Sequence, residues 1–149
     1  MKTGEINDIL FRGVTGKFYR GTFPADENFE FKAPYCIVTN CDSHNGPGSH
    51  WNAWFVTKSV IYFFDSYGRS PKDSSLPNSY SLFVKNKKIL YNHKIVEGIF
   101  SKTCGQFCIY VLYYLCSNVA WRDIIDSFVT NTEINEKNVC KLVRKLKKL

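Results

Sequence analysis

Short apolar runs, separated by polar and glycine-containing stretches, make up most of the chain before residue 104. Three runs have the length and the β-branched and aromatic side chains of strands: residues 35–39, 51–57 and 59–65. Thr57 and Lys58 suit a hairpin turn between the last two runs. Weaker patterns predict helices at residues 5–12 and 78–84 and a strand at residues 88–91. Residues 42–49 and 66–77 have the composition of loops.

The pattern changes at residue 104, where apolar positions take helical spacing. Residues 104–117 are apolar on nearly all sides, as expected of a buried central helix. Residues 122–129 and 135–149 carry apolar side chains on one face, and Asn135 is the predicted N-cap of the last helix. We therefore predict an α+β fold, a single domain over residues 1–149 with a small mixed or antiparallel sheet and helices packed on it.

The composition adds a basic surface to this picture. The 149 residues include 20 Lys and Arg against 13 Asp and Glu, a net charge of +7. The last predicted helix gathers basic side chains on its polar face: Lys137, Lys141, Arg144, Lys145, Lys147 and Lys148. Solvation is the simpler interpretation of such a face, and contact with a nucleic acid is the alternative.

The first residues and the longest apolar run bear on location. Residues 1–8 are unlike a signal peptide, and the apolar run 107–116 is too short to span a bilayer. We expect an intracellular protein without a membrane partner, in which the six cysteines are reduced. The spacing of Cys36 with Cys41, and of Cys104 with Cys108, does not suit a zinc knuckle, so no metal site is expected.

Two polar residues lie at the open ends of the predicted hairpin. His50 follows a Gly-Pro-Gly-Ser loop and directly precedes the first strand, and Asp65 ends the second strand. A turn centred on Thr57 and Lys58 sets a register in which His50 faces Asp65, with Cβ atoms about 5 Å apart. A carboxylate in that position accepts a hydrogen bond from the imidazole and fixes its tautomer.

Cys104 opens the most apolar helix of the chain. The positive end of a helix dipole favours the thiolate, and backbone amides there, including that of Cys104, can donate to an oxyanion. Gly105 is expected to leave space for a substrate backbone. Taken alone, Cys104 is equally well a buried structural cysteine. Together with His50 and Asp65 it forms a Cys-His-acid triad in a definite chain order, which is far more specific.

Three segments resemble the motifs of the adenain-like cysteine proteases, most closely those of virophages and Polinton/Maverick elements. They are Gly48-Ser49-His50-Trp51, Tyr62-Phe63-Phe64-Asp65-Ser66-Tyr67-Gly68 and Thr103-Cys104-Gly105-Gln106-Phe107-Cys108. The resemblance covers residues 5–117. It implies a papain-like core in permuted order, with Cys104 as nucleophile, His50 as base and Asp65 as the acid. Trp51, Gly48 and Gly105 would line the substrate groove.

The resemblance also implies a function. It is that of a viral cysteine endopeptidase that cleaves capsid or core precursor proteins at glycine-containing sites. Such an enzyme is packaged in the virion and acts in the virus factory or nucleus of the host cell. It requires no cofactor; DNA activates adenain, and a net charge of +7 is compatible with the same activator here. We expect a monomer.

One position departs from the family pattern. The family places an oxyanion-hole Gln seven residues before the nucleophile, where this chain has Glu97. An ionised carboxylate repels the developing oxyanion, and loss of one such donor costs about 10²–10³ in rate. A protonated Glu97, or Asn92 in another alignment, would restore a donor.

Two alternatives therefore stay open beside the viral endopeptidase. One is a deconjugating protease for a ubiquitin-like modifier, which the short chain disfavours. The other is a catalytically weakened homologue that binds capsid or nucleic acid, and Glu97 is its main support. The complete set of Cys104, His50 and Asp65 favours a working enzyme.

Overall fold

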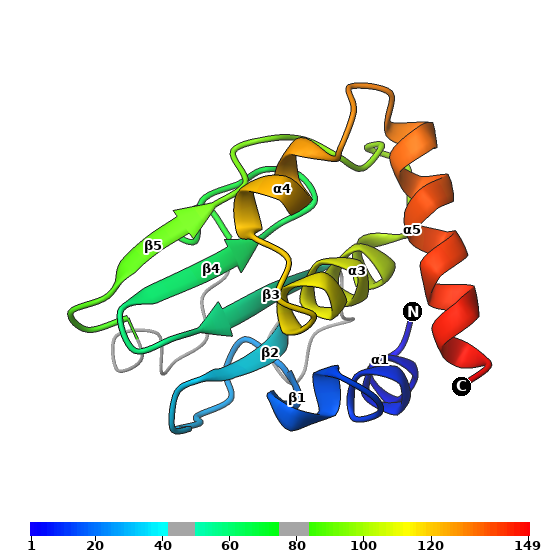
Figure 1. Ribbon diagram of the computed structural model, residues 1–149. Helices are drawn as coiled ribbons and strands as arrows, with labels where there is room; N and C mark the ends of the chain where they lie inside the picture. The colour runs from blue at the N-terminus through cyan, green and yellow to red at the C-terminus, as the bar shows by residue number, and fades with distance from the viewer. Residues whose placement is uncertain (42–49, 75–83) are drawn as a thin grey trace.

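The computed structural model describes residues 1–41, 50–74 and 84–149, and Figure 1 shows their arrangement around one sheet. The five strands lie in the order β1-β2-β3-β4-β5. Their bounds are Tyr19–Phe23, Tyr35–Asn40, Trp51–Val56, Val60–Phe64 and Lys88–Tyr91. The outer pairs, β1 with β2 and β4 with β5, are parallel, and the inner pairs are antiparallel. The mixed form of the predicted sheet is therefore confirmed.

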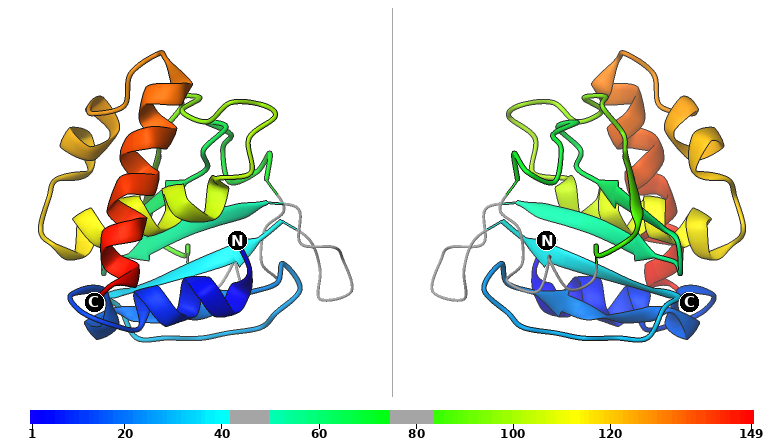
Figure 2. Two further views of the ribbon diagram at one scale, coloured as in Figure 1. Left: turned by 90° about the vertical axis from the view of Figure 1, so that its right-hand side faces the viewer. Right: turned by 90° about the vertical axis from the view of Figure 1, so that its left-hand side faces the viewer.

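Helices cover one face of this sheet (Figures 1 and 2). The described helices are α1 Thr3–Leu10, η1 Thr15–Lys17, α3 Cys104–Cys116, α4 Trp121–Asp126 and α5 Thr132–Lys147. Helix α3 packs on β3, and both α1 and α5 pack on α3. Since α3 has neighbours on most sides, its sequence is apolar nearly all round. Among the described residues, no helix has both the length and the apolar character needed to cross a bilayer.

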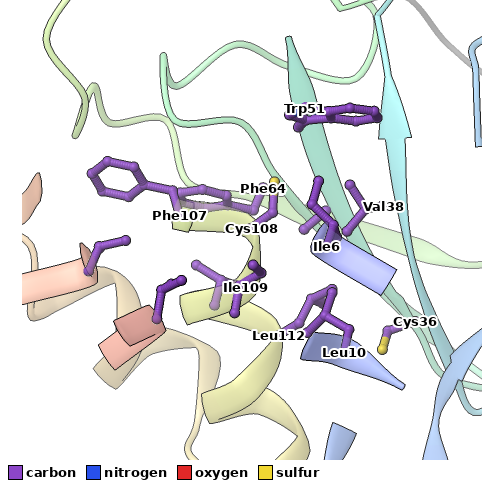
Figure 3. Close-up of a cluster of buried hydrophobic side chains, with 14 of the residues drawn as sticks. Ile6, Leu10, Cys36, Val38, Trp51, Phe64, Phe107, Cys108, Ile109 and Leu112 are labelled. Carbon is purple, nitrogen blue, oxygen red and sulfur yellow. The ribbon is translucent and has the colours of Figure 1, made fainter. Parts of the chain in front are cut away.

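The main core fills the space between α3, α1 and the sheet (Figure 3). Phe107 and Leu112 of α3 belong to one buried cluster with Ile6 and Leu10 of α1, and all four side chains are fully buried. A second cluster, which includes Trp54, covers the opposite face of the sheet. Strand β2 contributes to both clusters and is buried along its whole length. This explains why its first four residues, Tyr35 to Val38, are an apolar run without polar alternation.

Strand β1 was missed because its sequence contains a glycine and an exposed arginine. Gly21 has φ +136°, and the pairing of β1 with β2 shifts register between Tyr19 and Thr22. A glycine in a strand often marks such an irregularity. From the sequence alone, Gly21 was therefore interpreted as a break between elements. The predicted helix at 78–84 lies almost entirely outside the described residues, as do the loop 42–49 and Gly48.

The predicted start of the last helix is wrong by one turn. Helix α5 begins at Thr132, and the side chain of its N-cap, Asn131, accepts a hydrogen bond from the Glu133 amide at 3.0 Å. Asn135 is instead buried inside the helix, where its amide donates to the Val96 carbonyl at 3.1 Å. Its side chain also exchanges hydrogen bonds of 2.7 and 2.9 Å with the backbone of Val129. Asn135 thus ties α5 to the segment that leads into Glu97.

Candidate active site

The three side chains of the predicted triad come from three different elements. His50 directly precedes β3, Asp65 directly follows β4, and Cys104 is the first residue of α3. Because β3 pairs with β4 and α3 packs on β3, these element ends meet. The fold therefore brings together residues that the sequence separates by up to 54 positions.

The predicted register of the β3–β4 hairpin is wrong by two residues. Val56 pairs with Ile61, so the turn lies one residue later than predicted and His50 is not directly opposite Asp65. Side chains alternate between the faces of a sheet, so a shift of two residues leaves both on the same face. As diagonal neighbours they are still within reach of each other. His50 Nε2 lies 2.9 Å from Asp65 Oδ1.

Asp65 receives several hydrogen bonds besides that of His50. The Tyr67 amide donates to Oδ1 at 2.8 Å, while Arg69 Nε and Ser74 Oγ donate to Oδ2 at 2.8 and 2.9 Å. Burial raises the pKa of the Asp65 carboxyl, but the bonds from His50 and Tyr67 and the charge of Arg69 outweigh it and lower the pKa. Asp65 is therefore an ionised carboxylate with fixed orientation, although its side chain is fully buried.

Asn92 holds the backbone of Asp65 in place. Its Oδ1 accepts from the Asp65 amide at 3.2 Å, and its Nδ2 donates to the Asp65 carbonyl at 2.7 Å and to the Lys94 carbonyl at 2.9 Å. The alternative in which Asn92 supplies an oxyanion donor is therefore wrong, because both N–H groups of its amide are used here. Sequence reasoning gave no sign of this role.

Tyr67 and Gly68 shape the other side of the imidazole. The Tyr67 ring stacks on His50, with centroids 4.7 Å apart and planes 15° apart. Gly68 has φ +72°, and an added Cβ would lie 2.7 Å from the backbone of Lys94. Only glycine fits there, and the resulting turn brings Tyr67 and Arg69 back toward the acid. In the sequence, the glycine at position 68 directly after Tyr67 indicates a turn that could bring the Tyr67 ring to the imidazole.

His50 is buried between Asp65 and Cys104. Burial lowers the pKa of His50, but its hydrogen bonds to Asp65 and Cys104 outweigh burial and raise the pKa to about 9. A ring nitrogen of His50 lies within 4.8 Å of Cys104 Sγ. Since Nε2 is bonded to Asp65, the other nitrogen, Nδ1, is left for the sulfur. His50 therefore lies where it can exchange a proton with the sulfur of Cys104.

Glu97 is fully buried beside this pair. Its Oε1 accepts from the Thr103 amide at 2.7 Å and the Thr103 hydroxyl at 3.1 Å, and its Oε2 accepts from Ser66 Oγ at 2.5 Å. A carboxylate oxygen of Glu97 also lies within 4.8 Å of Cys104 Sγ. Three donors point at this carboxylate, so Glu97 acts as an acceptor that fixes the residue before the nucleophile.

A cleft opens over the cysteine. It is lined by Met1, His50, Trp51, Tyr67, Ser101, Lys102 and Cys104. Trp51, which was predicted to line the substrate groove, lines this cleft, and its Nε1 donates to the Met1 carbonyl at 3.1 Å. Gly105 differs from the prediction, because an added Cβ would meet Met1 at 3.1 Å and Trp51 at 3.3 Å. The side chains of Met1 and Trp51 occupy the space in which a substrate backbone was predicted. Because Gly105 has no side chain, these two residues can pack closely against the start of α3 beneath the cleft.

Comparisons with known proteins place the fold among cysteine proteases. No protein-family model matches the sequence, and no curated protein is significantly similar to it. Among solved structures, the crystal structure of the ASFV pS273R protease matches with a TM-score of 0.64 at 16% identity, covering 93% of this chain and 65% of that chain. The selenomethionine form of that protease matches with a TM-score of 0.50 at 22% identity, covering 70% of this chain and 42% of that chain.

These values establish the fold, which this chain shares with the ASFV pS273R protease. The chain spans 65% of the length of that neighbour, so it corresponds to part of the larger protein. The predicted fold class is confirmed, since the sheet and its helices match a cysteine protease of this type.

Proposed function

We propose that the protein is a viral cysteine endopeptidase with Cys104 as nucleophile, His50 as proton carrier and Asp65 as the group that orients His50. The observation that carries this proposal is the 2.9 Å bond between His50 and Asp65, with Cys104 Sγ within 4.8 Å of the imidazole in an open cleft. The fold of a cysteine protease supports it independently.

The reaction follows from these positions. The Cys104 thiolate attacks the scissile carbonyl carbon, and the carbonyl electrons move to the oxygen. As the C–N bond breaks, the His50 imidazolium gives its proton to the leaving amine, and a thioester to Cys104 remains. His50 then takes a proton from water, which attacks the thioester. Collapse of the second intermediate releases the acid and restores the thiolate. Asp65 stays ionised throughout and keeps the imidazole in position.

The oxyanion is stabilised by backbone amides at the start of α3, including that of Cys104. Glu97 is a positioning residue in this scheme. It binds the amide and hydroxyl of Thr103, so it fixes the loop from which the helix and its nucleophile start. This arrangement puts a carboxyl group, in place of an amide donor, near the developing charge, which favours a slow enzyme over a fast one.

The substrate in this proposal is a capsid or core precursor protein cut at glycine-containing sites. Met1, Trp51 and Tyr67 line the cleft together with Cys104, and a glycine in the substrate would let its backbone approach the sulfur closely. The enzyme acts as a monomer in the virus factory or nucleus and is packaged in the virion. It needs no cofactor, and the basic face of α5, which includes Lys141 and Lys145, suits DNA as an activator.

A noncatalytic capsid- or nucleic-acid-binding protein is the second candidate function. The observation that favours it is the Glu97 carboxylate at the position where the resembled family has an oxyanion donor. The two candidates differ in whether any peptide bond is cut.

Peptide cleavage separates the two candidates. A library of glycine-containing peptides is incubated with the wild type, with Cys104→Ala and with Cys140→Ala. Cys140 is a partly buried thiol on α5 that lies outside the cleft, so it is the matched control. We expect cleavage by the wild type and Cys140→Ala and none by Cys104→Ala. Absence of cleavage in all three, with folded proteins, supports the binding protein instead.

A further inference from the structure

Three side chains of different chemistry converge at the floor of the cleft. One donor atom each of Cys104, His50 and Glu97 lies within 4.8 Å of the other two. Thiolate, imidazole and carboxylate are the three ligand types that zinc takes in proteins. We propose that these residues form a zinc site, and that zinc bound there reversibly blocks the nucleophile. The inhibition rests on the proposed function, whereas the binding rests on the geometry alone.

The three donor atoms need to move only a short distance to surround a zinc ion. Zinc lies about 2.3 Å from sulfur and about 2.0–2.2 Å from nitrogen and oxygen, so tetrahedral ligands are about 3.3–3.6 Å apart. Donor atoms within 4.8 Å of one another therefore need to approach by at most about 1.5 Å. Rotation of the Cys104 side chain, which is only partly buried, supplies such a movement.

His50 is already oriented as a metal ligand. Metal-binding histidines commonly donate a hydrogen bond from their second ring nitrogen to a carboxylate, which fixes the tautomer and makes the ligand more basic. Here Nε2 is bonded to Asp65 Oδ1 at 2.9 Å, and Asp65 is itself held by the Tyr67 amide, Arg69 and Ser74. The nitrogen toward Cys104 is therefore the one available to a metal.

Glu97 has capacity for a further bond. A carboxylate offers about four acceptor positions, and the Thr103 amide, the Thr103 hydroxyl and Ser66 use three of them. Two of these bonds are to Oε1, so Oε2 keeps a free lone pair. The same bonds fix the carboxylate in place, as outer partners do around known metal sites. A Gln at this position would offer only a neutral amide.

The site suits zinc better than the abundant hard cations. A thiolate ligand selects against calcium and magnesium, which take oxygen ligands. Three protein ligands leave the fourth position open to water in the cleft, as in open zinc sites. Within residues 1–41, 50–74 and 84–149 this is the one set of at least three such side chains that could hold a metal.

The test measures zinc binding and inhibition separately. Zinc chloride is titrated against a chelating dye in the presence of the wild type, Cys104→Ala, Glu97→Gln, Glu97→Asp and Cys140→Ala, with circular dichroism to verify folding. We expect one zinc per wild-type chain, no binding to Cys104→Ala, and affinity reduced at least about 10-fold in Glu97→Gln. Glu97→Asp should keep part of the affinity, and Cys140→Ala all of it.

Cobalt chloride gives a second readout. Cobalt in this site should show a thiolate-to-metal charge-transfer band that is absent in Cys104→Ala. Equal zinc affinity of the wild type and Glu97→Gln would overturn the three-ligand site, as would zinc that binds equally to Cys104→Ala.

Zinc should also abolish peptide cleavage, with recovery on addition of EDTA. If zinc binds as expected but the zinc-free protein cuts no peptide, the proposed function is wrong and the metal site is still supported.

Discussion

In the proposed mechanism the chemistry depends on His50, because its ring hydrogen-bonds to both Asp65 and Cys104. Its pKa of about 9 results from Asp65 and Cys104 outweighing the effect of burial. At neutral pH the ring is therefore an imidazolium beside the sulfur, which is the form that a cysteine protease needs before attack.

This assignment predicts a particular pH dependence. The ordinary pKa of histidine is about 6.5, and the folded value of about 9 is higher. The protonated ring thus stabilises the fold fully below about pH 6.5, and this stabilisation is lost as the pH rises through 9. The value of kcat/KM should fall over the same alkaline range, and in Asp65→Asn the fall should move to lower pH. Initial rates between pH 5 and 10 check this, and an alkaline limb that Asp65→Asn leaves unchanged would contradict it.

Substitution of Glu97 gives a second prediction about a single residue. Replacement by Gln keeps an oxygen for Thr103 and puts an N–H donor in place of a negative charge near the nucleophile. Because one oxyanion donor is worth about 10²–10³ in rate, kcat should rise in Glu97→Gln, by up to about 10². Single-turnover rates on one cleaved peptide measure this. Glu97→Ala is the control, since it removes the charge without adding a donor, and an equal rise in both variants would assign the effect to charge alone.

At the scale of elements, one buried asparagine connects α5 to the site. Asn135 bonds to the backbone of Val96 and Val129, whereas Asn131 caps the helix at the surface. Loss of buried hydrogen bonds leaves their partners unsatisfied, so Asn135→Ala should lower the free energy of unfolding by about 2–3 kcal/mol. Asn131→Ala should cost about 1 kcal/mol. Urea denaturation compares the two, and a larger loss in Asn131→Ala would refute the assigned roles.

The loop before α3 carries exposed apolar side chains beside the cleft. Ile99 and Phe100 are 74% and 92% exposed, and the next residues, Ser101 and Lys102, line the cleft itself. We expect Phe100 to contact an apolar side chain of the substrate. Phe100→Ser should therefore raise KM several-fold and leave the unfolding midpoint unchanged, because the ring is not packed in the free protein. Steady-state kinetics test this, and a KM equal to that of the wild type would exclude the contact.

At the scale of the whole molecule, the sequence predicts the elements better than their connections. The positions of β2 to β5 and of the buried central helix follow from apolar patterns, because burial on both sides of β2 and around α3 favours apolar residues, whereas β1 has no such pattern. The partners of Asp65 could not be predicted, since Ser74 and Asn92 lie 9 and 27 residues after it and no local sequence pattern marks either one. The start of α5 was misplaced because two asparagines, Asn131 and Asn135, are equally good caps by residue type.

The approach of His50 to Asp65 was predicted from a wrong register, and the reason is general. An error of two residues preserves the face of every side chain, whereas an error of one would have separated them. The role of Glu97 could not be derived in the same way, because it depends on where Thr103 and Ser66 lie after folding.

The proposed mechanism depends on Cys104 being a nucleophile that His50 activates. The rate of alkylation by iodoacetamide at pH 6, resolved for each cysteine by peptide mapping, tests it most directly. An ordinary thiol with a pKa of about 8.5 is less than about 1% ionised at that pH. We predict that Cys104 reacts at least about 10-fold faster than the partly buried Cys140, and that His50→Ala removes the difference. Equal rates for both cysteines in the wild type would contradict the account.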